Sequence, residues 1–481
     1  MILQNIHLFT IIAPLLLGFL SFAVKDKGGK VANYAFLFAC VVMFAITLTS
    51  IYKLNLLNGK TYYNVMGGWN KAIGIELKIT LMRVFCSASV FLIATIFLAI
   101  NIEGTISYAI RGFAFIMLCG ANGMIMTNDI FNTYVFFEIV CITSYIFYAH
   151  TNKAECIKNT YNYLILSGFA SVIFLLVAGI LYQITGQLNL DLINQKLLSF
   201  KNNRTLNALY IMFILSMMFK LGVYPLHNIV FGIYKHLSPR YLSMVSGISA
   251  IVYPFFILKF IVLLFGTNIS GNNEYLDLSL KLFGGIGFVF FSLMAFTTKY
   301  FLNFIISLAF AQTSMFAFCI SYLPEKIIVI GIVLSITSHA ILKVCLLGLI
   351  DKMSINCNIW KIKKEDLCNI EPIFNKYVLS LLVFLISGMP LSIVFISKWY
   401  ILTGVLNTSE HIIWIILLLI GFALDIIACF SLIMRILMKN NNNTLKLTMQ
   451  KNYILLSILI TAMAFVIIST FYTYSFKLSQ I

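Results

Sequence analysis

Long apolar runs recur along the whole chain, with short polar connections between them. Each run is about twenty residues long, the length that an α-helix needs to cross the hydrocarbon core of a bilayer. The pattern predicts an all-α polytopic membrane protein with about fourteen transmembrane helices. We expect these helices at residues 4–24, 31–52, 79–101, 106–126, 130–150, 159–184, 206–233, 241–266, 280–298, 303–322, 327–350, 377–404, 411–434 and 452–475.

Two of the apolar runs are interrupted by helix-breaking residues. Gly222 and Pro225 interrupt the seventh run, and the stretch Gly388–Pro390 interrupts the twelfth. Each interrupted run also carries one lysine, Lys220 or Lys398, and a charge at membrane depth costs about 2.5–3.5 kcal/mol. Transporters build ion sites from broken helices of this kind in two repeats. We therefore predict two inverted repeats, with helices 7 and 12 broken.

The two interruptions suggest how the chain is divided. Residues 1–105 would hold the first three spans. Residues 106–266 would form the first repeat with spans 4–8, and residues 279–438 the second repeat with spans 9–13. Residues 451–481 would add the last span. Each repeat would then contain one broken helix and its lysine, which is one half of a channel.

Acidic and basic residues inside the spans are candidates for function. Glu138 lies about two turns into the fifth span, and Lys220 is its natural partner across helices because buried charges need compensation. Asp129 stands at the start of that span, where capping of the helix is the ordinary role. His227 follows Lys220 beyond the break. It is either a proton shuttle or a hydrogen-bonded wall residue.

The second half of the chain has its own titratable positions. His339 and Lys343 are four residues apart and therefore share one face of the eleventh span. Two such groups inside a membrane indicate a proton relay. Asp425, in the thirteenth span, is a buried acid that suits a counter-charge. Arg83 and Lys259 lie near span ends, where long basic side chains commonly snorkel to the interface.

The composition excludes an ordinary soluble enzyme, because 61% of the residues are hydrophobic and 10% are charged. The net charge of +17 comes without any nucleic-acid motif, so no nucleic-acid partner is expected. Lys and Arg are more numerous in the odd-numbered connections. The positive-inside rule then puts both termini on the non-cytoplasmic side. The ten cysteines form no Cys-x-x-Cys pair, and we expect neither a metal nor a cofactor.

Four stretches carry a resemblance to a known family. They are Asn128–Glu138, Lys220 with Pro225–His227, Ser338–Lys343 and Phe395–Trp399. They resemble the antiporter-like subunits shared by Mrp-type multisubunit cation/proton antiporters and NADH:quinone oxidoreductase (complex I). The likeness runs from about Gly67 to Trp399, and the fifth span is most similar to the D-type subunit of Mrp antiporters.

The resemblance implies a role for each of these positions. Glu138 and Lys220 would be the ion pair of the first half-channel, His339 and Lys343 the central relay, and Lys398 the exit lysine. The chain departs from the family pattern at three places, and at one of them Phe231 and Gly232 replace a proline and an acidic residue. Ile251 takes the place of a lysine that is usual in the eighth span, and Leu302–Asn303 replaces a basic pair. The path between Lys220 and His339 therefore has a gap in the sequence.

We expect a proton-translocating subunit of a multisubunit Na⁺/H⁺ antiporter in the inner cell membrane. Its partners would be other integral membrane subunits, protons, Na⁺ and the lipid bilayer. One alternative is a proton-pumping membrane-arm subunit of complex I. This chain contains no redox motif, so it would not itself be the redox enzyme. A further alternative is a divergent structural subunit that has lost transport, which the Ile251 departure favours.

Overall fold

The computed structural model describes residues 2–24, 29–56, 61–102, 107–150, 154–198, 203–265, 274–353, 362–371, 373–408, 411–438 and 447–448. The fourteenth expected span, 452–475, and with it the region 451–481, lies outside these residues. Within the described residues, twelve helices are long and apolar enough to cross a membrane. Two shorter apolar helices, Asn375–Ser387 and Ile393–Thr408, occupy the twelfth expected run.

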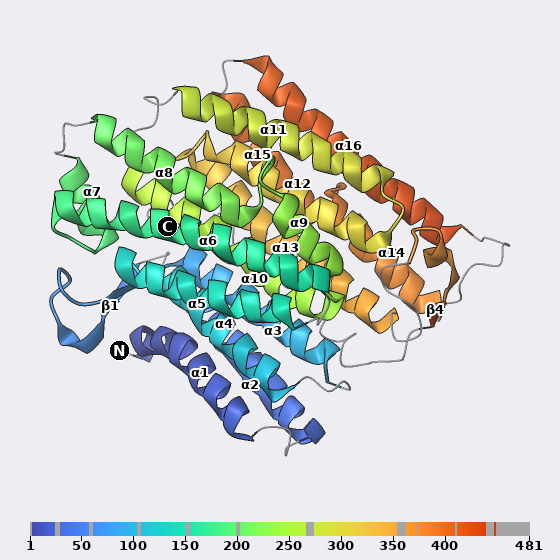
Figure 1. Cartoon of the computed structure of the whole chain (residues 1–481), viewed down its shortest axis with the longest axis horizontal. Coiled ribbons are helices and arrows are strands. Elements are labelled where there is room, and N and C mark those ends of the chain that lie inside the picture. The colour runs from blue at the N-terminus through green and yellow to red at the C-terminus, as the bar shows by residue number, and fades with distance from the viewer. Residues whose placement is uncertain are drawn as a thin grey trace.

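The chain is a bundle of helices that run side by side, oblique to its long axis (Figure 1). Helices α1 and α2 lie at one edge of the bundle, and α11 and α16 lie at the opposite edge. The bounds of the helices are α1 Ile2–Val24, α2 Gly29–Leu56, α3 Leu81–Ile100, α4 Tyr108–Met126, α5 Ile130–Ala149, α6 Ala154–Thr185, α7 Leu190–Leu197, α8 Asn203–Leu221, α9 Asn228–His236, α10 Pro239–Phe260, α11 Glu274–Thr297, α12 Phe301–Ile320, α13 Lys326–Met353, α14 Ile373–Ser387, α15 Ile393–Thr408 and α16 Ile412–Leu437.

The centre of the bundle consists of α3, α10 and α13, which pack against one another. Every residue of α3 is buried, and α13 is buried along nearly all of its length. A helix that is apolar on all sides belongs in such a position because each of its faces meets another helix. By contrast, α6 exposes large apolar side chains such as Phe169 and Val172. Those side chains face the hydrocarbon of the membrane.

The two predicted interruptions are confirmed. The seventh run is divided into α8 and α9, and the twelfth into α14 and α15. Gly222 and Gly388 stand at these breaks with φ angles of +66° and +77°. Only glycine adopts this backbone conformation without strain, so each break is set by the sequence at that point.

Short elements not expected from the sequence close one end of the bundle. Strands β1 (Tyr62–Val65) and β2 (Glu76–Ile79) form an antiparallel hairpin in the connection between α2 and α3. Leu77 of this hairpin pairs with Thr127 after α4, and Asp129 before α5 pairs with Asn189 before α7. At the other end, strands β3 (Ile370–Glu371) and β4 (Leu447–Thr448) pair in parallel.

Candidate functional site

Lys220 lies in the last turn of α8, just before the break, and is 3% exposed. Its Nζ donates hydrogen bonds to the Ser167 hydroxyl of α6 and to the Cys141 sulfur of α5. The distance from Nζ to the sulfur is 3.1 Å. The ammonium also lies 4.7 Å from the centre of the Phe137 ring. The lysine is thus held by two neutral polar groups and an aromatic face.

Glu138 lies near Lys220 in the same part of the bundle but does not pair with it. No ion pair joins the two side chains in the described part of the chain, so the expected contact is wrong as stated. Glu138 instead lines a pocket of about 550 Å³ between α5 and α6, and one of its buried carboxylate oxygens, Oε1, has no hydrogen-bond partner. The exposed side chains of Ile142 and Leu164 at this pocket show that it opens on the side of the bundle.

A second cavity lies in the centre of the bundle and connects the two halves of the candidate path. Lys220, His339 and Lys343 all line it. Its volume is about 40 Å³, which is enough for a few water molecules, since one water needs about 10–15 Å³. Polar side chains surround the space between the three titratable residues: Tyr234, Ser246, Ser249, Tyr253, Gln312 and Thr313.

This cavity spans the gap that the sequence left between Lys220 and His339. Ile251 is fully buried, and it is not among the residues that line the cavity. The face of α10 that borders the cavity carries Ser246 and Ser249 instead. Hydroxyl groups and the space for water therefore take the place of a side chain at position 251.

His339 and Lys343 lie together on α13, as their spacing predicted. Both are buried, and both face the central cavity. Lys343 Nζ donates a hydrogen bond to the backbone carbonyl of Ser246 at 2.9 Å. The side-chain amide of Gln312 on α12 donates a hydrogen bond to the hydroxyl of Ser335, which lies one turn before His339 on α13. Hydrogen bonds thus join α13 to α10 through Lys343 and to α12 through Ser335.

His227 lies apart from this cavity. It precedes α9 at the break and packs edge-on against Phe291 of α11, with the ring centres 4.8 Å apart. Its Nδ1 is buried without a hydrogen-bond partner. Phe310, which lines the cavity, also contacts the His227 ring. Of the expected residues in the first half, only Lys220 reaches the cavity itself.

Lys398 of α15 forms an ion pair in the second half of the bundle. Its Nζ lies 3.2 Å from the carboxylate of Asp425 on α16, and both side chains are buried. Lys398 also donates to the carbonyl of Ser387 at 3.0 Å, where the break leaves that group free. The Ser292 hydroxyl donates to the other oxygen of Asp425 at 2.7 Å. Asp425 is the counter-charge that its position suggested.

Arg83 and Lys259 do not snorkel, because both are fully buried. Arg83 Nη1 donates to the carbonyls of Met126 and Thr127 at 3.0 and 3.2 Å. Lys259 Nζ donates to the carbonyls of Met124 and Thr127 at 2.9 and 3.0 Å. These carbonyls belong to the C-terminal end of α4, where helix carbonyls lack intrahelical partners and the dipole favours cations. The sequence did not reveal this tertiary contact.

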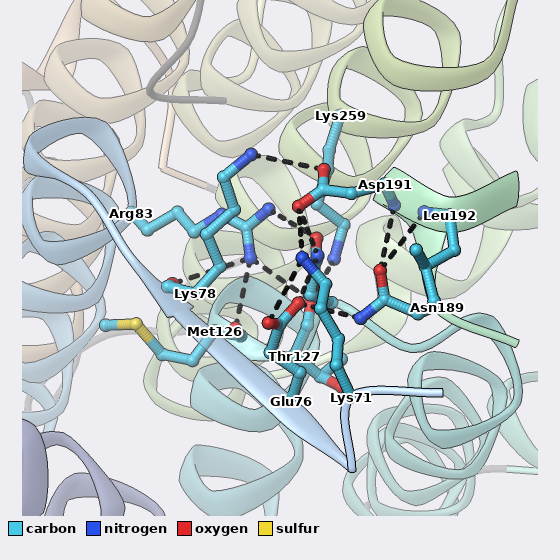
Figure 2. A network of polar contacts seen from close by, with 11 residues as sticks. Lys71, Glu76, Lys78, Arg83, Met126, Thr127, Asn189, Asp191, Leu192 and Lys259 are labelled. Atoms are coloured by element: carbon cyan, nitrogen blue, oxygen red, sulfur yellow. Dashed lines mark hydrogen bonds and ion pairs between the residues drawn. The ribbon is translucent and has the colours of Figure 1, made fainter. Parts of the chain in front are cut away.

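The same end of the bundle holds two acids that the sequence did not single out, the buried Glu76 and the partly exposed Asp191 (Figure 2). Glu76 of β2 accepts hydrogen bonds from the side-chain amides of Asn128 and Asn189 at 2.9 and 2.7 Å. Asp191 of α7 lies 3.4 Å from the ammonium of Lys78. This network ties the β-hairpin to the α4–α5 junction and to α7. Asp129, in turn, caps α5 by accepting from the Asn132 backbone at 2.7 Å, as expected.

Opposite charges fix the ionisation of this network. Burial alone would raise the pKa of the Asp191 carboxyl, but the positive charges of Lys78, Lys71 and Arg83 outweigh burial and lower it. Burial, followed by repulsion from Arg83, lowers the pKa of Lys78. Asp191 therefore carries its negative charge at neutral pH and compensates the surrounding cations.

Comparison with known proteins identifies the family. Residues 127–424 match the model of the family described as NADH:quinone oxidoreductase/Mrp antiporter, TM. The chain belongs to this family. Over 236 residues it is 28% identical to the D-type subunit of the Na⁺/H⁺ antiporter of Alkalihalophilus pseudofirmus, covering 47% of this chain and 46% of that protein. The chain spans about half the length of the curated relatives it matches.

Two solved structures share the fold over nearly the whole chain. One is a chain of the membrane-bound sulfane sulfur reductase, an archaeal respiratory membrane complex, with a TM-score of 0.86, 20% identity and coverage of 99% of this chain and 96% of that one. The other is a chain of the Mrp complex from Dietzia sp., with a TM-score of 0.83, 14% identity and the same coverage. The predicted polytopic fold of antiporter-like subunits is confirmed.

Metal and cofactor sites were not expected, and the described residues contain no group of three or more His, Cys, Asp or Glu side chains placed to hold a metal ion. The cysteines of this part of the chain are free thiols, nearly all of them buried. The basic groups at the cavity are Lys220, His339 and Lys343, and the phenol groups of Tyr234 and Tyr253 line it as well. The arrangement is suited to proton transfer through hydrogen bonds.

Proposed function

We propose that this chain is the proton-translocating subunit of a multisubunit Na⁺/H⁺ antiporter, in which protons move along buried Glu, Lys and His side chains. The observation that carries the proposal is the central cavity, which Lys220, His339 and Lys343 line together. Buried ionisable residues in a membrane protein are costly and mark ion or proton pathways. The likeness to the D-type subunit of a Na⁺/H⁺ antiporter supports Na⁺ as the exchanged cation.

The proposed path runs through both halves of the bundle. A proton reaches Lys220 from the pocket that holds Glu138, crosses the water-sized cavity to His339 and Lys343, and continues toward Lys398. Hydroxyl groups along the cavity wall donate and accept hydrogen bonds, so they relay protons without changing their own charge. His227 lies beside the path, against Phe291 and Phe310, and would accept or donate a proton at the break.

The membrane setting of the path belongs to the same proposal. The chain would lie in the inner cell membrane with both termini on the non-cytoplasmic side, because its basic residues favour the odd-numbered connections. Residues 106–266 and 279–438 would be the two inverted repeats, each with a broken helix and a lysine. The partners would be other integral membrane subunits, as in the multisubunit complexes that share this fold.

A second candidate is a proton-pumping membrane-arm subunit of complex I, which the family description names beside the Mrp antiporter. Both functions use the same proton path and differ in the partners that drive it. Purification of the intact complex from its native membrane distinguishes them. Small membrane subunits alone would support the antiporter, whereas co-purified flavin and iron–sulfur subunits would support the redox complex. A structural subunit without transport is disfavoured, because the cavity bridges the gap at Ile251.

The test of transport is proton flux in everted membrane vesicles that contain the whole complex. Addition of Na⁺ to vesicles with a preformed proton gradient should collapse the gradient, and a pH-sensitive dye reports the rate. We expect Lys220→Ala to abolish this flux, because it removes the ionisable group that both lines the cavity and contacts Ser167 of α6. The Glu138→Ala variant should likewise lose antiport.

The matched control for Lys220 is Lys326→Ala, which removes an exposed lysine at the start of α13. This variant should transport like the wild-type protein. Each variant is first checked for insertion at the wild-type level. Wild-type flux in Lys220→Ala would contradict the proposed function, whereas equal loss in both lysine variants would point to a general effect of charge.

A further inference from the structure

Lys220 and Glu138 border two different spaces. Lys220 lines the central cavity, and Glu138 lines the pocket between α5 and α6. The two spaces share no lining residue. Proton exchange between the two side chains therefore needs a connection through the side chains that separate the spaces.

Two hydroxyl groups form such a connection. Tyr145 lies two turns after Glu138 on α5 and lines the same pocket. Its hydroxyl forms a 2.6 Å hydrogen bond with the hydroxyl of Ser167 on α6, which is fully buried. The Ser167 hydroxyl in turn accepts a hydrogen bond from Lys220 Nζ on α8. The three helices α5, α6 and α8 lie next to one another in the bundle (Figure 1).

Both hydroxyls have the chemistry that a proton relay needs. A hydroxyl donates one hydrogen bond and accepts others, so a row of hydroxyls can pass protons by exchanging O–H bonds and then rotating back. The Tyr145 side chain on its helix leans toward the N-terminal end, which is the direction of Glu138. The pocket wall is mostly apolar, so the water that joins the two residues must be held by its polar side chains, Glu138, Tyr145 and Thr160.

We propose that Ser167 and Tyr145 carry the proton between Lys220 and the Glu138 pocket, in place of a direct Glu138–Lys220 ion pair. This inference rests on the proposed function and names two residues of its path. The O–H bond of a protonated Glu138 breaks as water passes a proton to the Tyr145 oxygen, and the proton of Tyr145 passes to Ser167. The Ser167 oxygen gives its proton to the Lys220 amine. One proton moves, and it leaves a carboxylate at Glu138 and an ammonium at Lys220.

Cys141 touches both Lys220 and the Tyr145 side chain, so its thiol is a second neighbour of the connection. Its sulfur lies 3.1 Å from Lys220 Nζ and 3.6 Å from the hydroxyl of Tyr253, which lines the central cavity. A thiol is a weak donor and a weak acceptor, and this one is buried. The Cys141→Ala variant therefore shows whether the loss of any side chain that contacts Lys220 lowers the proton flux to the same extent.

The experiment compares conservative and disruptive variants of the relay in the sodium-driven vesicle assay with the whole complex. Ser167→Ala and Tyr145→Phe each remove one oxygen, and we expect each to lower the initial proton flux by about a hundredfold, the lower end for a lost proton-transfer group. Ser167→Thr keeps the hydroxyl and should retain most of the flux. Cys141→Ala should also retain most of it.

Two further variants control for packing and for position. Ser171→Ala removes a buried hydroxyl one turn along α6, which bonds to the Gly168 carbonyl and does not touch Lys220. Tyr161→Phe removes an exposed hydroxyl from the same helix. Both controls should transport like the wild-type protein. The amount of inserted complex and its thermal unfolding midpoint are measured for every variant.

The outcomes separate this inference from the proposed function. Wild-type flux in both Ser167→Ala and Tyr145→Phe, with no flux in Lys220→Ala, would overturn the relay alone. Wild-type flux in Lys220→Ala would overturn the function as well. Should Ser167→Ala fail to accumulate, Tyr145→Phe decides, because it leaves the ring and its packing in place. Loss of flux in Ser167→Thr equal to that in Ser167→Ala would also contradict the relay.

Discussion

The two lysines at the broken helices have opposite surroundings. Lys398 pairs with the Asp425 carboxylate at 3.2 Å, whereas Lys220 contacts a hydroxyl, a thiol and an aromatic ring. A carboxylate only accepts hydrogen bonds, so it favours the ammonium form of its partner. Hydroxyl and thiol groups can accept from an ammonium or donate to an amine. The Lys220 site therefore accommodates both protonation states, and the Lys398 site is built around one.

The largest expected effect tests how strongly the Lys398–Asp425 ion pair stabilises the fold. We expect Asp425→Ala to lower the free energy of unfolding by about 3–5 kcal/mol, because it leaves a buried ammonium without its partner. Glu138→Ala should cost less than about 1 kcal/mol, since Glu138 has no ion pair to lose. Unfolding of the purified protein in detergent, followed by temperature or denaturant, measures both.

The double variant Lys398→Ala with Asp425→Ala provides the control for this comparison. Its stability should recover part of the loss, because neither charge is then buried alone. If Asp425→Ala and Glu138→Ala destabilised the protein equally, the contrast between the two halves would be wrong.

A smaller effect is expected at the break before Lys398. Gly388 has a φ angle of +77°, and a Cβ atom at this position would lie 2.9 Å from Cδ and 3.1 Å from Nζ of Lys398. Gly388→Ala should therefore destabilise the protein by about 1–3 kcal/mol through strain and should disturb the Lys398–Asp425 pair. The matched control is Gly179→Ala on α6, where a Cβ atom would meet nothing within 4 Å.

The stability of Gly388→Ala and of the control is measured in the same unfolding assay. Gly179→Ala should leave stability unchanged or raise it slightly, because alanine favours a helix interior over glycine. A Gly388→Ala protein as stable as the wild type would show that the break tolerates a side chain, and that Lys398 is not held by it.

The smallest effect concerns the charge network outside the membrane spans. Asp191→Asn should lower the free energy of unfolding by about 1 kcal/mol, because the carboxylate lies partly exposed among Lys71 and Lys78. The charges of these lysines lower the pKa of Asp191 against the effect of burial. Its contribution is therefore complete above the ordinary carboxyl pKa of about 4 and is lost as the pH falls through the lowered value.

The measurement is the unfolding midpoint of both proteins between about pH 7 and pH 3. The midpoints of the wild-type protein and of Asp191→Asn should differ by a constant amount down to about pH 4 and should converge below it. A carboxylate held by cations no longer stabilises the fold once it is protonated. A difference in unfolding midpoint that grew as the pH fell would therefore contradict the network.

Much of the architecture was determined by the sequence alone. The apolar runs fixed the helices because a bilayer requires continuous apolar stretches of a set length. Gly222 and Gly388 marked the breaks because few other residues adopt their backbone angles. The pairing of His339 with Lys343 on one face followed from helical spacing. These features depend on residues close in sequence.

Contacts between distant segments were decided only by the tertiary structure. The chain contains several buried cations and acids, and sequence spacing does not say which of them meet across helices. Lys398 forms an ion pair with Asp425, whereas Lys220 forms hydrogen bonds with Ser167 and Cys141 rather than an ion pair with Glu138. Arg83 and Lys259 donate hydrogen bonds to backbone carbonyls at the end of α4 instead of extending to the membrane interface. Each outcome depends on how the helices rotate and pack, and that is a property of the whole bundle.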